Sequence, residues 1–514
     1  MQKGNTQKTL GKKKPAKDAI IDLANQIAIP IRSTDGRNYV VMKDKKHLAL
    51  PLSGGNSQAI HEICYQYYVR NNKWVGRDGI NNLASYLTTR CSISEPVEVN
   101  LRSGFSDGAI HLDYGDKECH VLKVDAEKIE LTRESSVIFT RSMVTGRFPE
   151  LVDEASDLRE LLKYVRVEEQ ALPALVGTII GMWFSNIPQP IVLLHGSAGA
   201  GKTTSLRFIL DLVDPSTKMP GGSLTEKVRD LKSLAVLRRV LVFDNASYVN
   251  AETSDNLARI ATGGELSMCS LYENDLPHLT VIMRPILING IMNGFTRSDL
   301  ASRAISFELN AIPEEERSAF SELEREWDEA KPKIFRALLE ITSRLLRNES
   351  PFWQMVTTRH RNIDLMRIIA FVSSELQIDG LTYVDNSIDS LSHVVLDSSL
   401  VSEALRATIE CARGDIGECR HSDSYIVNGV IRDSQFFDSY LDLSEIRQHL
   451  EDHTPFDQRK NLPDTAKQLG EALKRVESDL INIYGVTMEK KKTNKRMKYV
   501  FSQKESYDSV SMAN

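Results

Sequence analysis

The chain has 514 residues, of which 41% are hydrophobic. This length exceeds the size of a domain with a single hydrophobic core, so several domains are expected. No uninterrupted apolar run reaches membrane-spanning length, so we expect no membrane-spanning helix, and the net charge of −6 argues against a uniformly basic coat for nucleic acid. The six cysteines contain no C-x-x-C pair and the N-terminus lacks an apolar secretory core, so we expect a cytoplasmic protein.

The first 150 residues mix helical and strand patterns. Residues 1–18 are polar and rich in lysine, which predicts a disordered tail. Over residues 19–150 we expect an α+β domain with helices at 57–74 and 80–90. Four short strands should follow at 109–115, 119–125, 128–133 and 136–142.

Acidic residues in this domain do not suggest metal chemistry. Asp113 and Asp116 fall at a strand end and in a hairpin, where acidic residues are common, and Cys119 beside His120 has no further ligands at zinc spacing. No paired-carboxylate primase site is evident either. We therefore predict that this chain alone does not polymerise nucleotides.

Two helices are predicted before the next motif. The first covers 153–166, and the second covers 168–185 and is apolar on nearly all sides. A helix of the second kind suits the interior of a domain. We assign residues 151–311 to one nucleotide-binding core.

The segment IVLLHGSAGAGKTTSL at 191–206 predicts a phosphate-binding loop between a strand and a helix. Gly196, Gly201, Lys202 and Thr203 fill the frame G-x-x-x-x-G-K-[ST]. Glycines let backbone N–H groups point at phosphate oxygens, and the following helix N-terminus adds its dipole. Lys202 should reach the β- and γ-phosphates of ATP. The residues expected around the nucleotide are Gly196, Ser197, Ala198, Gly199, Ala200, Gly201, Lys202, Thr203 and Thr204.

Polar residues end the strand-like runs that follow. Asp244 and Asn245 close an apolar strand in the Walker B pattern, so Thr203 and Asp244 are the expected Mg²⁺ ligands. Asn289 lies near the end of the next strand, where it can orient water or sense the γ-phosphate. Arg303 precedes a further strand and is a candidate to stabilise phosphate charge, in its own subunit or in a neighbour's.

The rest of the chain predicts a helical lid and a winged helix. Residues 312–424 carry helical apolar spacing, with Trp327 and Trp353 expected in the core. Residues 425–504 give helix, turn, helix and a two-stranded hairpin, and 505–514 are expected to be a disordered tail. The hairpin is basic, which predicts DNA binding through Lys490, Lys491, Lys492, Lys495, Arg496 and Lys498.

Several of these motifs, taken in order, resemble a known family. HGSAGAGKTT, VLVFDNAS, SDNLARIATGG, LYENDLPH, RPILINGI and TRSDLASRA together resemble the ATPase domain of phage- and mobile-element-encoded primase–helicase-like proteins. These are relatives of the superfamily-three helicases within the AAA+ class. The resemblance covers roughly residues 152–342.

The resemblance implies a role for each matching residue. Lys202 and Thr203 would bind nucleotide and Mg²⁺, Asp244 would be the Walker B acid, Asn289 sensor 1 and Arg303 a finger acting on the neighbouring subunit. A hairpin at 271–278 would project into the channel of a ring and touch DNA through His278.

This sequence departs from the family pattern at two places. Asn245 stands where many AAA+ ATPases have a second carboxylate as the base for water, although an amide can still orient water. The 271–278 hairpin offers His278 in place of a lysine or arginine. Unwinding is therefore less strongly indicated than ATP binding.

The expected architecture is α/β, with a P-loop AAA+ core of the superfamily-three type, an N-terminal α+β domain, a helical lid and a winged helix. The expected function is that of an ATP- and Mg²⁺-dependent, DNA-associated motor of a mobile genetic element, assembled as a ring such as a hexamer. Two alternatives stay open. One is an ATP-gated DNA-binding switch, such as a regulator or defence component, and the other is a nucleotide-binding scaffold that never hydrolyses.

Overall fold

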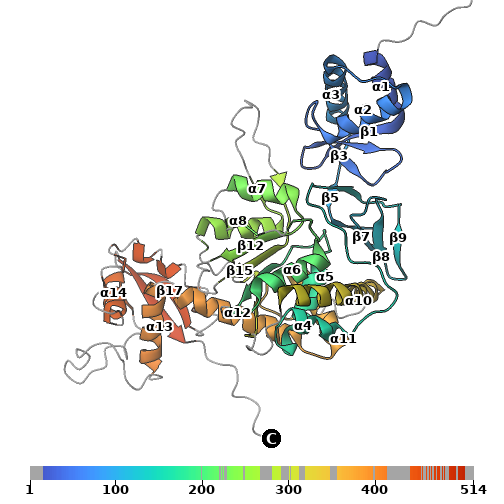
Figure 1. The fold of residues 1–514 in the computed structure, drawn as a ribbon. Coiled ribbons are helices and arrows are strands. Elements are labelled where there is room, and N and C mark those ends of the chain that lie inside the picture. Colours follow the sequence, from blue (N-terminus) through green and yellow to red (C-terminus); the bar gives the residue numbers. More distant parts are fainter. Residues whose placement is uncertain are drawn as a thin grey trace, which may run out of the picture.

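The computed structural model describes most of the chain (Figure 1). The described residues are 16–197, 199–218, 221–222, 224, 228–246, 249, 251–266, 280–290, 300, 302–311, 319–347, 356–397, 400–413, 440–452, 454, 459, 462–463, 465, 468–470, 472–474, 477, 480, 486–493 and 496–503. Within these residues, no helix combines the length and the apolar character that crossing a lipid bilayer requires.

The N-terminal part forms a small α+β unit with its own core. Its strands are β1 (Ala28–Ser33), β2 (Asn38–Met42), β3 (Ala49–Pro51) and β4 (Pro96–Val97), in the sheet order β3-β2-β1-β4. Its helices are α1 (Ala16–Ile27), α2 (Gln58–Asn71) and α3 (Arg77–Ser92). Ile60, Ile63 and Leu83 are fully buried between these elements. The two helices predicted in this region are confirmed.

An antiparallel meander follows and packs on the central part of the molecule. The strands are β5 (Val99–Leu101), β6 (Ser103–Ser106), β7 (Ala109–Asp113), β8 (Val121–Val124), β9 (Ile129–Thr132) and β10 (Ile138–Thr140). The sheet order is β6-β7-β8-β9, and β10 pairs in parallel with β5. The four predicted strands are confirmed. Leu112 and Leu122 share a core with Phe335 of a helix more than 200 residues later.

The helix predicted at 153–166 is wrong over most of its length. That stretch forms only the turn η1 (Leu158–Glu160) and the short helix α4 (Leu161–Tyr164). Asp157 has an extended backbone and caps the turn by accepting from the N–H of Arg159, which marks where helical structure begins. The second predicted helix exists as η2 (Glu169–Ala171) and α5 (Leu172–Gly181), and every residue of α5 is buried, as its apolar composition predicts.

A parallel sheet lies at the centre of the fold. Its strands are β11 (Ile191–His195), β12 (Leu241–Ala246), β15 (Ile286–Gly290) and β16 (Ala304–Glu308), in the order β12-β15-β11-β16. Alternate residues of β11 face opposite sides: Val192 and Leu194 join one apolar cluster, and Ile191 and Leu193 join another. The sheet is therefore covered on both faces, as parallel sheets require.

Helices cover the two faces of this sheet (Figure 1). One face packs on α5, α6 (Lys202–Val213), α10 (Phe320–Arg347) and α11 (Ile363–Leu376). The other packs on α7 (Val228–Leu237), α8 (Ala251–Thr262) and part of α12 (Gly380–Asp397). Trp327 is fully buried, as predicted, and Trp353 lies outside the described residues.

Two short strands that flank the predicted 271–278 hairpin form an antiparallel pair. They are β13 (Glu265–Leu266) and β14 (Thr280–Val281). The tip expected to touch DNA, with His278, lies outside the described residues.

The C-terminal part has a separate core. It contains α13 (Leu400–Arg413), α14 (Leu443–Asp452) and the antiparallel strands β17 (Val486–Thr493) and β18 (Arg496–Gln503). Ile446, Val486 and Phe501 are buried together with Leu405 of α13. The predicted first helix and both strands of the hairpin are confirmed. The second helix of the predicted helix–turn–helix lies partly outside the described residues.

Candidate nucleotide site and its surroundings

The loop between β11 and α6 depends on three glycines. Gly196, Gly199 and Gly201 have φ angles of 144°, 81° and 77°, which other residues rarely adopt. A Cβ on Gly196 would lie 2.7 Å from the carbonyl oxygen of Leu309 on the neighbouring chain segment. The glycines therefore let the backbone curl tightly between the strand end and the helix start. Ala198 lies outside the described residues.

Lys202 is the first residue of α6 and folds back over this loop. Its Nζ donates to the carbonyl oxygens of Gly196 and Ser197, at 2.9 Å each. The ammonium group is thus held at the loop by neutral acceptors. Any anion with stronger acceptor oxygens can take their place without breaking an ion pair.

Three predicted residues from three different elements meet beside the loop. Asn289 on β15 donates from Nδ2 to Asp244 Oδ1 at 2.6 Å and to Thr203 Oγ1 at 3.1 Å. Thr203 Oγ1 in turn donates to Asp244 Oδ1 at 3.1 Å. Because β11, β12 and β15 are parallel, their carboxyl ends meet at one edge of the sheet, and Thr203 begins the helix at that edge. The hydroxyl and carboxylate oxygens are of the kind that Mg²⁺ prefers.

A bulge turns Asp244 and Asn245 away from the regular strand. The β12–β15 register shifts between Phe243 and Ala246, and Asn245 has a φ of 57° with an exposed side chain. Gly290 makes this close approach fit, because a Cβ there would lie 2.1 Å from the carbonyl oxygen of Ala246. The bulge therefore places Asp244 toward Thr203 and leaves Asn245 open to solvent.

A cavity of about 360 Å³ opens next to His195, the residue before the loop. Burial lowers the pKa of His195, and the nearby Lys202 lowers it further while Glu308 opposes the shift. The Tyr383 hydroxyl on α12 donates to the carbonyl oxygen of Ser306 at 3.1 Å on the same wall. The cavity lies between the sheet edge, η2 and α12. No local sequence signal marks it, because its walls come from segments more than 200 residues apart, from Glu168 to Ser390.

Arg303 lies at the opposite end of the sheet from the loop. β16 pairs in parallel with β11 from Ile191↔Ala304 to His195↔Glu308. Arg303 therefore lies just before the amino ends of these two strands, whereas the glycine loop follows the carboxyl end of β11. The five paired residues of β16 span four steps along the strand, which is roughly 13 Å. Arg303 is therefore remote from the loop of its own chain.

The C-terminal hairpin keeps several of its basic groups against local partners. Lys498 Nζ donates to the Tyr440 carbonyl oxygen at 3.0 Å, Lys491 Nζ lies 3.4 Å from Glu489, and Lys490 Nζ lies 5.6 Å from the ring centre of Tyr499. Lys491 and Lys498 are paired across the strands and share one face. Lys495 and the side chains of Lys492 and Arg496 lie outside the described residues.

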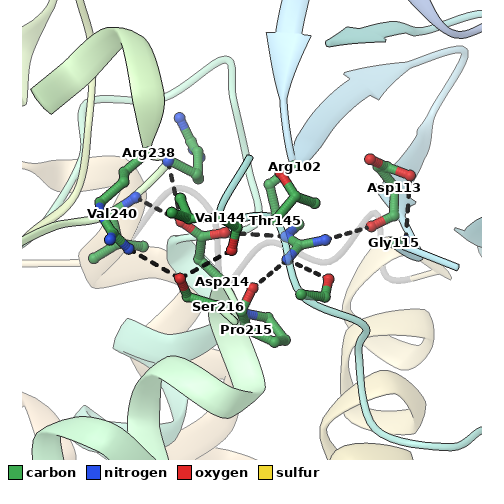
Figure 2. A network of polar contacts seen from close by, with 12 residues as sticks. Arg102, Asp113, Gly115, Val144, Thr145, Asp214, Pro215, Ser216, Arg238 and Val240 are labelled. Atoms are coloured by element: carbon green, nitrogen blue, oxygen red, sulfur yellow. Dashed lines mark hydrogen bonds and ion pairs between the residues drawn. The ribbon is translucent and has the colours of Figure 1, made fainter. Parts of the chain in front are cut away.

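The far end of α6 is tied to the N-terminal strands by a buried arginine (Figure 2). Arg102 Nε donates to Asp214 Oδ1 at 3.0 Å, directly after the last residue of α6. The Asp214 carboxylate also accepts from the backbone N–H of Arg239 at 3.0 Å, just before β12. The other guanidinium hydrogens go to the carbonyl oxygens of Asp113, Gly146 and Pro215. Arg102 and Asp214 together thus join the meander, the end of α6 and the segment leading to Asp244.

One group of metal-binding residue types occurs in the described part of the chain, in the β7–β8 turn. Ligand atoms of Asp116, Glu118 and His120 lie within 4.8 Å of one another. Asp116 is hydrogen-bonded to His120, and Arg141 Nη1 donates to the Asp116 carbonyl oxygen at 2.5 Å. These contacts explain why the three side chains lie together: they stabilise the β7–β8 turn.

The central part of the chain is similar to a known family. Residues 156–394, just under half of the chain, match the family model described as actinomycete integrative conjugative element replication protein. These limits enclose the glycine loop, Asp244, Asn289 and Arg303. No curated protein matches the chain.

The solved structures that match this chain at low identity include two titled as helicases. The active helicase Cch of SCCmec type IV is 13% identical, with 93% of each chain covered and a TM-score of 0.43. The apo NrS-1 C-terminal region is 10% identical over 95% of this chain and 99% of that chain, with a TM-score of 0.40. The JCV helicase is 15% identical over 46% of this chain and 65% of its own, with a TM-score of 0.25.

Proposed function

We propose that this chain binds and hydrolyses ATP with Mg²⁺ and acts as a DNA-associated replication motor of a mobile genetic element. The observation that carries the proposal is the meeting of Thr203, Asp244 and Asn289 beside a glycine loop that ends in Lys202. The match of residues 156–394 to replication proteins of an integrative conjugative element supports the biological setting.

The side chains divide the work of phosphoryl transfer. Thr203 and Asp244 would hold Mg²⁺, which neutralises charge on the β- and γ-phosphates when bound. Lys202 would exchange its two carbonyl acceptors for phosphate oxygens. Asn289, whose two amide hydrogens are taken by Thr203 and Asp244, would present its amide oxygen to the attacking water. The cavity beside His195 would take the nucleoside, with polar and aromatic groups on its walls.

Arg303 would complete the site of a neighbouring subunit. Its place at the opposite end of the sheet keeps it away from its own loop, whereas a ring brings that end of one subunit to the loop of the next. The proposed assembly is therefore a homo-oligomeric ring, in which DNA contacts come from the basic C-terminal hairpin and from the 271–278 segment with His278.

A switch without unwinding is the second candidate function, and Asn245 favours it. The residue after Asp244 is exposed and is an amide, which cannot accept a proton from water. Turnover would then be slow, and nucleotide binding itself would drive assembly on DNA. Strand displacement from a forked DNA substrate separates the two functions, since only the motor gives displaced strand.

The first test is ATP hydrolysis with and without single-stranded and duplex DNA. We expect DNA to raise turnover and both Lys202→Ala and Arg303→Ala to abolish it. Mixing the two inactive variants should restore part of the activity, because some interfaces then pair an intact loop with an intact arginine. No recovery in mixed rings would contradict a finger acting between subunits. ATP binding with phosphate release at background under every condition would remove the motor and favour the ATP-gated switch, with a nucleotide-binding scaffold as the remaining alternative.

A further inference from the structure

Helix α2 carries aromatic residues on the face turned away from its own core. Ala59, Ile60, Ile63 and Tyr67 are buried, whereas Tyr65 is 57% exposed and Val69, one turn later, is 59% exposed. A helix that buries one apolar stripe normally shows a polar outer face. The outer face of α2 is instead partly aromatic.

The chain that leaves α2 adds a tryptophan to this face. Asn72 has a φ of 49° and ends the helix, which turns the chain back so that Trp74 stacks on Tyr68. The ring centres are 4.3 Å apart with planes 19° from parallel. Trp74 is nevertheless 75% exposed, so the ring face that does not contact Tyr68 is open to solvent. The stack holds the tryptophan in one orientation.

Cationic residues lie close to these aromatic residues in the sequence. Arg70, Lys73 and Arg77 are all exposed, and within the described part of the chain none of the three forms an ion pair. The acidic groups nearby in sequence are Glu62, which accepts a hydrogen bond from Gln66, and Asp78. The local balance is positive in a protein whose net charge is −6.

We infer that the surface formed by Tyr65, Tyr68, Trp74, Arg70, Lys73 and Arg77, which we call the α2 surface, binds single-stranded DNA. An unpaired base can stack on the open face of Trp74, and the three cations can contact the phosphates on either side of it. A duplex hides its base faces inside its own stack, so this chemistry selects single strands. A protein partner would gain little here, because the exposed aliphatic area is limited to Val69 while three unpaired cations would have to be covered.

This surface is separate from both proposed DNA contacts described above. Figure 1 shows α2 at the end of the molecule opposite the hairpin of β17 and β18. The inference extends the proposed DNA association, yet it requires neither ATP turnover nor a ring. It assigns to the N-terminal unit the task of holding a single strand.

The test is equilibrium binding of a fluorescent oligothymidine to the full chain without nucleotide. We expect Trp74→Ala to weaken binding roughly 5- to 100-fold and Trp74→Phe to retain most of the affinity, because stacking needs a ring. Neutralising Arg70, Lys73 and Arg77 to glutamine should lower the slope of log K against log salt by about 2, as expected for three phosphate contacts to a single strand.

Matched controls separate this surface from charge in general. Lys45→Gln with Lys46→Gln removes exposed cations of the same unit, and Ile93→Ala removes an equally exposed apolar side chain; both should leave affinity unchanged. Photo-crosslinking of the wild-type chain to 5-iodouracil-substituted DNA should place adducts on Tyr65 or Trp74. This arm needs no substituted protein, so a folding defect cannot obscure it.

Unchanged affinity of Trp74→Ala, together with adducts confined to other segments, overturns the inference. If affinity is then lost in Lys490→Gln with Lys491→Gln, the proposed DNA association stands without the α2 surface. If the α2 surface binds single-stranded DNA but the chain never hydrolyses ATP, the inference is supported and the proposed motor is contradicted.

Discussion

At the scale of single residues, the candidate site rests on a hydrogen-bonded triangle of hydroxyl, carboxylate and amide. Thr203 and Asp244 are partly open to solvent, and Asn289 is buried beneath them. Burial fixes the amide, so its two N–H···O bonds hold the outer pair in position. Changes at the outer residues should alter chemistry more than stability.

Asp244→Asn tests this reading, since it keeps the size of the side chain and removes its charge. We expect ATP turnover to fall by about two orders of magnitude or more, because Mg²⁺ loses its anionic ligand. The melting temperature should change little. Turnover at the wild-type level would contradict the assignment of Asp244, and a large loss of melting temperature would point to a structural role instead.

His360 gives the fold a pH dependence at a single residue. Burial lowers its pKa from 6.5 to about 4, and its Nδ1 accepts from the N–H of Asn362 at 3.1 Å, which requires the neutral ring. Between pH 6.5 and 4 the unfolded chain binds a proton that the folded chain does not. The free energy of unfolding should therefore fall by up to about 3 kcal/mol as pH drops through this window, with no contribution above it.

Urea unfolding at several pH values between 7 and 4.5 measures this slope. His360→Gln should show a shallower decline than the wild type, whereas His61→Gln, at an exposed position, should follow the wild-type curve. Parallel curves for the wild type and His360→Gln would show that other groups carry the acid sensitivity.

At the scale of elements, close contact between helices decides how α5 meets α11. A Cβ on Gly177 would lie 2.7 Å from Ile369 Cγ1 and 3.0 Å from Ile369 Cα, so the second contact is with backbone that cannot turn aside. Gly181, one turn later, faces the side chain of Leu365, whose Cδ1 would lie 2.5 Å from an added Cβ. Small residues one turn apart let the two helices approach closely, and this packing lies directly behind the central sheet.

Gly177→Ala should therefore destabilise the fold although alanine favours helices. We expect a loss of about 1–3 kcal/mol in the free energy of unfolding, because the helices must move apart. Gly76→Ala is the matched control: no atom lies within 4 Å of the added Cβ, and a change below about 1 kcal/mol is expected. Equal effects of the two substitutions would show that the α5–α11 contact yields easily.

At the scale of the whole molecule, Arg102 links parts that are far apart in sequence. Its guanidinium joins the meander to Asp214 at the end of α6, and α6 begins with Lys202 at the glycine loop. The arginine is 3% exposed, so its charge is compensated almost entirely by protein groups. If nucleotide binding moved α6, Arg102 would therefore transmit that movement to the strands of the meander.

Arg102→Met should lower the free energy of unfolding by about 3 kcal/mol or more. The Asp214 carboxylate and three carbonyl oxygens would each lose the hydrogen bond that Arg102 donates. Arg159→Met removes an exposed arginine paired with Glu169 and should cost less than about 1 kcal/mol. Thermal unfolding of the two variants beside the wild type makes the comparison. A loss at Arg102 no larger than that at Arg159 would contradict the proposed link.

The sequence by itself determined what local patterns encode. Glycines, a lysine and a threonine at fixed spacing indicate the loop, apolar runs place Asp244 and Asn289 at strand ends, and alternating residues mark the strands of the 486–503 hairpin. Parallel strands end at one edge, so the meeting of Thr203, Asp244 and Asn289 follows from the order of elements. Where local cues were ambiguous, as at 153–166, capping by Asp157 shortened the helix.

Only the tertiary structure decided which distant segments meet. Arg102 and Asp214 are 112 positions apart, Gly177 touches Ile369, and the cavity beside His195 closes with α12. No short-range pattern encodes such pairs, because each depends on how whole elements pack. The α2 surface has the same origin: the pattern of 57–74 predicts a helix, but which of its aromatic residues stay exposed depends on the core that buries the others.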